Sequence, residues 1–195
     1  DHPYPDPAWL FDLGAALLHR LGGIPALTVG KAIVVGLAFG LAFLVCRRRG
    51  AGPAATALTL ALAAWVVLPR MVERPHVFSF LGEAAMLWLL VVQARRPRAA
   101  ALAVPLVALW ANLHAGAFLG PMILGLAACG AWLDRRCSAT VAPAVPVAAM
   151  LAASAALLAT PVGFGIVDYL GAHVGLQAIH PVDEFRPPDV QSDAA

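Results

Sequence analysis

The chain of 195 residues is 61% hydrophobic and 12% charged, with a mean hydropathy of +0.81. Typical soluble domains carry roughly 25% charged residues, so this composition excludes an ordinary soluble domain and indicates a membrane protein. The net charge of +2 gives no reason to expect nucleic acid as a partner, because the arginines cluster at the ends of apolar segments rather than along one face.

The first predicted elements are an extended segment and a surface helix. Residues 1–8 are rich in Pro and Asp, which disfavour helix. Large apolar side chains then recur at steps of four, at Trp9, Leu13, Leu17 and Leu21. This spacing, followed by Gly22 and Gly23, predicts an amphipathic helix that lies at a membrane interface and stops at the glycine pair.

Several apolar segments follow, and a helix needs about 20 apolar residues to cross a hydrocarbon core of roughly 30 Å. The stretch 99–133 is too long for one span and carries the polar residues Asn112 and His114, so we expect it to turn near His114 to Gly116. Residues 164–180 predict a further surface helix. The expected spans are 24–46, 53–69, 76–93, the two halves of 99–133, and 139–160.

The predicted fold class is therefore all-α, a polytopic transmembrane helix bundle of about six spans plus interfacial amphipathic helices. We expect a single transmembrane domain over residues 1–195, with an outer segment at 1–23, the bundle at 24–160 and an outer tail at 161–195. The sequence starts without Met and shows no recognisable signal peptide, which is typical of a piece of a longer protein.

The arginines predict the orientation, because short cytoplasmic loops are enriched in Lys and Arg. Most of the 13 basic residues fall on alternate loops, at Arg47, Arg48, Arg49, Arg95, Arg96, Arg98, Arg135 and Arg136. The remaining loops then face outward. The predicted location is the bacterial cytoplasmic (inner) membrane, with the lipid bilayer as the first partner.

Acids, arginines and histidines converge on the predicted outer face. Arg70 and Arg74 lie where the orientation rule disfavours cations, so they indicate an anionic partner such as a phosphate, or else a solvated loop. Asn112 and His114 either line a cavity open to the outside or cap two helix ends. The candidate substrate-binding residues are Arg70, Arg74, His76, Asn112, His114, Asp183 and Glu184.

A second candidate is an intramembrane pair. His76, Ser79 and Glu83 share one helix face, and an acid inside the membrane costs roughly 2.5 to 3.5 kcal/mol unless it has a partner. Lys31 is expected at a similar depth and is the natural partner of Glu83. Alternatively, Lys31 extends to the headgroups and Glu83 is a neutral acid in a helix contact. The histidines lack the spacing of a ligand pair, so no metal site is predicted.

Four motifs carry a resemblance: "ERPHVFSF", "LWANLHAGAFLG", "TPVG" and "DEFRPPD". In this order they resemble a large group of bacterial multi-pass membrane proteins with RPHxFSF and WxNLHxGxxxG motifs, which look distantly similar to the GT-C glycosyltransferases. Thr160, Val162 and Phe185 depart from the usual Asn, Tyr and Trp of that group.

The resemblance implies a transferase that acts on a lipid-linked sugar, a polyprenyl-phosphate sugar, at the outer face of the cytoplasmic membrane. GT-C enzymes use an acid in the first outer loop, often with a divalent cation. That loop would precede Asp1, so we expect the catalytic acid, and any divalent cation bound with it, to belong to the full-length protein. No residue of this chain is named catalytic, and no cofactor is predicted for it.

Two other functions fit the sequence. The chain could be a transporter or flippase for an anionic lipid or solute, with Lys31 and Glu83 as coupling residues at mid-depth. It could also be a non-catalytic membrane subunit that packs against other subunits of a larger complex.

Overall fold

The computed structural model describes residues 8–67, 74–93, 97–137, 147–165 and 171. All regular structure in this part of the chain is helical, so the predicted all-α fold is confirmed for these residues. The longer helices are α1 (Trp9–Arg48), α2 (Pro53–Val67), α3 (Val77–Gln93), α4 (Ala103–Leu113), α5 (Leu119–Cys137) and α6 (Val147–Ala156). Two 3-10 helices, η2 (Pro97–Leu102) and η3 (Ala115–Phe118), precede α4 and α5.

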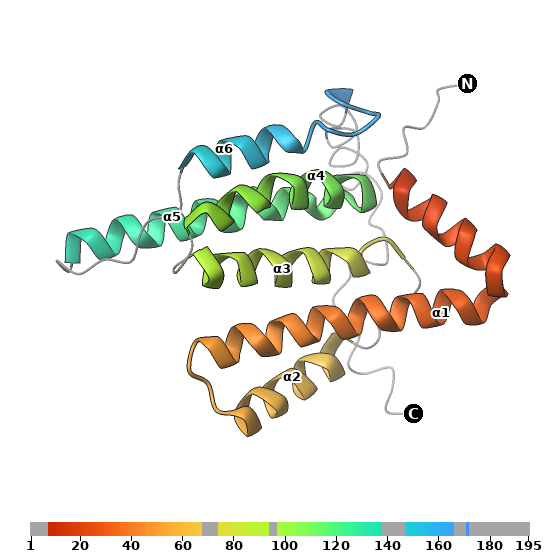
Figure 1. Cartoon of the computed structure of the whole chain (residues 1–195), viewed down its shortest axis with the longest axis horizontal. Helices are drawn as coiled ribbons and strands as arrows, with labels where there is room; N and C mark the ends of the chain where they lie inside the picture. The colour runs from red at the N-terminus through yellow and green to blue at the C-terminus, as the bar shows by residue number, and fades with distance from the viewer. Residues whose placement is uncertain (1–7, 68–73, 94–96, 138–146, 166–170, 172–195) are drawn as a thin grey trace.

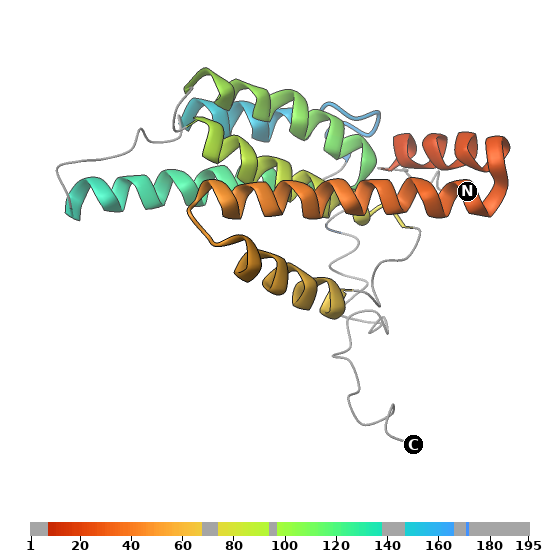
Figure 2. The same cartoon turned by 60° about the horizontal axis from the view of Figure 1, so that its bottom comes forward.

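The helices run back and forth along one direction (Figure 1). The long part of α1, α3 and α5 point one way, whereas α2, α4 and α6 point the other way. In both views α1 separates α2 from the remaining helices, and α3 packs along the opposite side of α1 (Figure 2). This antiparallel order is what short connections between successive helices predict.

The antiparallel order puts the arginine-bearing helix ends together. Arg47 and Arg48 end α1, Arg98 lies in η2, and α5 ends at "DRRC", and Figure 1 shows these segments at one end of the bundle. Arg74, just before α3, and His114, just after α4, lie at the opposite end. The predicted alternation of the arginine clusters is therefore confirmed for the described residues.

Helix α1 consists of two legs that meet at the predicted glycine stop. Gly22 (φ −159°, ψ 20°) and Gly23 (φ 62°, ψ −151°) are non-helical, and the shorter leg turns back toward the end of α4 (Figure 1). The predicted stripe of Trp9, Leu13, Leu17 and Leu21 is exposed on this leg. Leu13, Leu17 and Leu21 therefore leave an apolar surface open to lipid, as a helix at a membrane interface requires, whereas the indole of Trp9 contacts α4.

Replacing Gly23 with alanine is expected to lower the free energy of unfolding by about 1–3 kcal/mol, because essentially only glycine adopts its backbone angles. Gly14→Ala is the matched control on the same leg, since a Cβ at Gly14 has no atom within 4 Å. It should be neutral or stabilise by up to about 1 kcal/mol. Denaturant titration in mixed micelles measures both changes, and equal losses in the two variants would contradict the turn at Gly23.

Two helical segments are long and apolar enough to cross a membrane, Trp9–Arg48 and Ala115–Leu133. Four more apolar helices are shorter, Pro53–Val67, Val77–Val92, Arg98–Leu113 and Val147–Ala156. At about 1.5 Å per residue, each of these four falls short of a hydrocarbon core of roughly 30 Å. These lengths favour membrane association, while the number of six spans stays a prediction.

The outer side of α2 is apolar and exposed. Leu58, Leu62, Trp65 and Val66 are between 61% and 78% exposed. A soluble monomer rarely leaves such a continuous apolar surface in water, because burial of apolar area is the main favourable term in folding. The exposed face of α2 is therefore further support for a lipid environment.

The core lies between α3, α4, α5 and α6. Its largest fully buried side chains are Met86, Val107, Trp110 and Leu124. Alanines fill the remaining core positions and let the helix backbones approach closely, as in helix packing inside membranes. Because Trp110 lies near the end of α4, this core also supports the turn that follows it.

Candidate functional site

The motif "LWANLHAGAFLG" forms a sharp turn between α4 and α5. Helix α4 ends at Leu113, His114 is extended (φ −162°, ψ 140°), and η3 begins at once. Gly116 and Ala117 are buried, so the turn packs inside the bundle rather than over its surface. The predicted break of the 99–133 stretch is confirmed at the predicted residues.

A chain of hydrogen bonds joins this turn to the start of α3. The indole Nε1 of Trp110 donates to Ser79 Oγ at 3.1 Å, and Ser79 Oγ lies 2.7 Å from His114 Nδ1. The backbone N–H of Gly116 also donates to His114 Nδ1, at 3.1 Å. The two motifs "FSF" and "NLHAG" therefore meet through Ser79 and His114.

Three glycines make room for this network. A Cβ at Gly116 would lie 2.5 Å from Ser79 Oγ and 2.7 Å from His114 Nδ1. A Cβ at Gly82 would overlap the indole ring of Trp110, and one at Gly120 would lie 2.7 Å from Val107. Because real Cβ atoms do not approach so closely, these positions require glycine, and the side chains around the turn are held tightly.

The Ser79 and His114 distance is that of a nucleophile and its base, but the surroundings oppose nucleophilic catalysis. Ser79 is 7% exposed, and its oxygen accepts the Trp110 N–H, which withdraws electron density from it. Burial lowers the pKa of His114 below its ordinary value, and nearby His76 lowers it further. At neutral pH the ring is uncharged, and the network acts to orient it.

The side chain of Asn112 joins separate segments of the bundle by hydrogen bonds. Its Oδ1 accepts from Trp9 Nε1 at 2.6 Å, which fixes the short leg of α1 to α4. Its Nδ2 donates to the carbonyl oxygens of Ala108 at 2.8 Å and Ala159 at 2.7 Å. Of the two alternatives predicted for this pair, capping holds for His114, whose ring caps η3, whereas Asn112 joins three segments instead.

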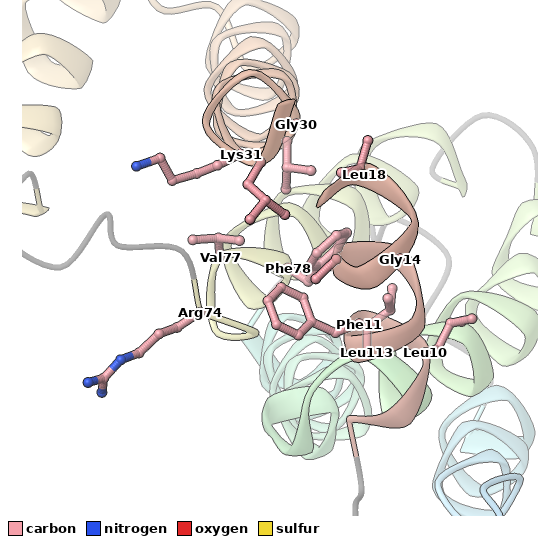
Figure 3. Close-up of a pocket in the computed structure, with 13 residues that line it drawn as sticks. Leu10, Phe11, Gly14, Leu18, Gly30, Lys31, Arg74, Val77, Phe78 and Leu113 are labelled. Carbon is pink, nitrogen blue, oxygen red and sulfur yellow. The ribbon is translucent and has the colours of Figure 1, made fainter. Parts of the chain in front are cut away.

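An apolar pocket of about 160 Å³ lies where the two legs of α1 meet the start of α3. Phe11, Leu18, Phe78 and Leu113 form its walls, with Phe11 and Phe78 in edge-to-face contact at 6.1 Å. Figure 3 shows that the side chains of Lys31 and Arg74, which also line the pocket, extend away from it on the same side, with their charged ends apart from each other. The pocket itself is therefore apolar, and the two cationic groups lie outside it.

The remaining predicted site residues that the structure describes lie outside the hydrogen-bonded network of Trp110, Ser79 and His114. His76 lies at the start of α3 in edge-to-face contact with Phe80, at 5.9 Å. Lys31 and Glu83 lie on α1 and α3, which pack together, and their pairing stays a prediction. Arg70, Asp183 and Glu184 lie outside the described residues. Among the described residues, no group of three His, Cys, Asp or Glu side chains is placed to hold a metal ion.

The sequence alone did not reveal several contacts at the end of the bundle where α4 turns into α5. The sequence analysis places Trp9 in the apolar stripe, Trp110 in the WxNLHxGxxxG motif and Ser79 on one face with His76 and Glu83, without a contact for any of them. Gly82, Gly116 and Gly120 were the available signal, because glycine inside apolar helices marks close approach. Comparison of the chain with models of known families, with curated proteins and with solved structures finds no match.

Proposed function

We propose that this chain is the core of a GT-C-like membrane glycosyltransferase that binds a lipid-linked sugar phosphate at the end carrying Arg74, His76 and His114. The pocket beside α1 is the observation that carries the proposal. Its apolar walls suit the first carbons of a lipid tail, since a cavity of about 150 Å³ holds a molecule such as benzene. Lys31 and Arg74 extend away from the pocket in Figure 3, and their side chains would turn toward its edge to supply the charge that a phosphate needs.

The proposed orientation follows from the arginine-rich helix ends. With those ends in the cytoplasm, the pocket opens toward the outer face of a bacterial inner membrane. The exposed apolar surfaces of α1 and α2 support contact with lipid. We include the six spans in this proposal.

The proposed chemistry is displacement of a lipid phosphate from a sugar by an acceptor hydroxyl. Negative charge develops on the phosphate oxygens as the bond to the sugar breaks, and cations fixed beside them lower the barrier. Arg74 and Lys31 would hold the phosphate, while His76 and His114 would contact its oxygens or the sugar. A divalent cation in the full-length protein would add further positive charge.

Arg74→Ala is expected to lower the rate of sugar transfer by about 10²-fold or more, the scale on which a charge-stabilising donor acts. Membranes that contain the complete gene product are incubated with radiolabelled polyprenyl-phosphate sugars, and transfer of label to endogenous acceptors is measured. Arg98→Ala is the matched control, because Arg98 is an exposed arginine at the opposite end of the bundle. Equal rates for the Arg74→Ala and parent proteins would reject the role of Arg74.

A second candidate is a carrier for an anionic lipid. The pocket lies between two legs of α1 that meet at Gly22 and Gly23, and a discontinuous helix beside a ligand site is typical of transporters. In liposomes, a carrier would move a fluorescent anionic lipid between leaflets without sugar transfer, and Glu83→Gln would remove the pH dependence of that movement. Transfer of labelled sugar distinguishes the transferase from this alternative.

A further inference from the structure

The hydrogen bonds around His114 determine which of its ring nitrogens carries the proton. The backbone N–H of Gly116 can only donate, so His114 Nδ1, 3.1 Å away, must be an acceptor. A neutral imidazole that accepts at Nδ1 has its proton on Nε2. The donor and acceptor roles along the network are therefore fixed from this end.

The rest of the network follows from this end. Because His114 Nδ1 is an acceptor, the hydroxyl hydrogen of Ser79 points to it at 2.7 Å. The indole N–H of Trp110 is a donor only, so Ser79 Oγ accepts it at 3.1 Å, which is compatible with that direction. The arrangement is therefore Trp110 to Ser79 to His114 Nδ1, and the N–H of Gly116 sets its direction.

A proton on Nδ1 would disrupt this arrangement. It would face the N–H of Gly116 and would also compete with the hydrogen of Ser79. Because a Cβ at Gly116 would already lie 2.5 Å from Ser79 Oγ, the turn has no space to move aside. Burial and the nearby His76, which lies just before α3, both lower the pKa of His114 and so also favour the neutral ring.

We infer that His114 is held as the Nε2–H tautomer and donates this hydrogen to an anionic oxygen of the ligand, and that Ser79 and Trp110 are positioning residues for it. The ligand part of this inference rests on the proposed function. Leu113 and Val77, the chain neighbours of His114 and His76, line the pocket, whereas the two histidines do not. The proposed anionic oxygen therefore lies outside the pocket, beside the start of α3 and the end of α4. A donor of fixed direction at His114 would complement the charges of Lys31 and Arg74.

The tautomer is tested by nitrogen NMR of protein that is ¹⁵N-labelled at histidine and reconstituted in lipid nanodiscs. The signal of His114 is assigned by its loss in His114→Gln, and its two ring nitrogens report where the proton resides. We expect the Nε2–H tautomer between pH 6 and 8 in the parent protein, values taken as roughly the range in which histidine ordinarily titrates. An Nδ1–H tautomer in the parent protein would overturn the inference.

Ser79→Ala and Ser79→Thr form the matched pair. We expect Ser79→Ala to give a mixture of tautomers and to shift the pKa of His114 upward toward its ordinary value, whereas Ser79→Thr retains the hydroxyl and the parent tautomer. Trp110→Phe removes the indole N–H together with part of the buried ring system, and it should shift the tautomer in the same direction as Ser79→Ala. Unchanged His114 signals in Ser79→Ala would overturn the positioning role of Ser79.

The ligand role is tested with dodecyl phosphate as the probe. We expect Ser79→Ala to weaken the binding of dodecyl phosphate by roughly tenfold at pH 8. At pH 6 the binding should recover, because the protonated ring of His114 again carries a hydrogen on Nε2. Binding of the probe that is unaffected by His114→Gln would overturn the donor role. Failure of the proposed function can be distinguished from failure of this inference. If only the proposed function is wrong, Arg74→Ala leaves sugar transfer unchanged, while the NMR result for His114 still holds.

Discussion

Truncation of Trp110 to alanine is expected to lower the free energy of unfolding by about 3–5 kcal/mol, the range for removal of a large buried aromatic side chain. Trp110 is 2% exposed and lies in the core between α3, α4 and α5. Its indole N–H also donates to the buried Ser79 Oγ, which loses a partner when the ring is removed. The two losses add because one concerns packing and the other a polar atom.

Trp65→Ala is the matched control for this experiment. Trp65 is 78% exposed on α2, so its truncation removes the same atoms without creating an internal cavity. We expect a change within about 0.5 kcal/mol, the usual range for exposed positions. Reversible denaturation in mixed micelles, followed by circular dichroism, gives both values. A loss for Trp65→Ala as large as that for Trp110→Ala would contradict the assignment of the core.

The sequence predicted the all-helical fold and two of its breaks, whereas α6 ends at Ala156, before the predicted end of its span at residue 160. Hydrophobic length predicted spans at 24–46, 53–69 and 76–93, and the structure has helices over Pro53–Val67 and Val77–Gln93. The stop at Gly22 and Gly23 followed from the conformational freedom of glycine, and the turn at His114 followed from the excess length of one apolar stretch. These features depend on local composition, which a single sequence contains.

The side-chain partners could not be predicted in the same way. Ser79 and His114 are separated by 35 positions, and Trp9 and Asn112 by 103. Which atoms meet across such distances depends on the register between packed helices, and a shift of one residue turns a different face toward the neighbour. Sequence reasoning therefore found the polar residues of this end, but it could not predict that Asn112 bonds to Trp9, Ala108 and Ala159.

The pocket could not be predicted from the sequence, because it is lined by a second apolar face of the short leg of α1. The short leg of α1 was expected to lie flat at an interface, with its stripe of Trp9, Leu13, Leu17 and Leu21 as the only apolar side. Its other face is apolar as well, and Leu10, Phe11, Gly14, Ala15 and Leu18 turn toward the long leg and α3 to line the pocket. A helix with two apolar faces can lie against protein and lipid together, which a simple amphipathic pattern does not predict.

Gly82→Ala is expected to destabilise the protein by about 1–3 kcal/mol, although alanine is the better helix former by up to about 1 kcal/mol. The added Cβ would lie within 2.6 Å of three ring atoms of Trp110. The ring cannot move away easily, because Gly120 and Val107 hold its other side. Packing therefore outweighs helix propensity at this position.

Gly36→Ala on α1 is the control of opposite sign. A Cβ at Gly36 meets no atom within 4 Å, so only the gain in helix propensity remains, up to about 1 kcal/mol. The double variant Gly82→Ala/Trp110→Ala should lose less stability than the sum of its single variants, because the colliding ring is absent. Simple additivity in that cycle would show that Gly82 and Trp110 do not contact one another, and the close approach of α3 to α4 would have to be abandoned.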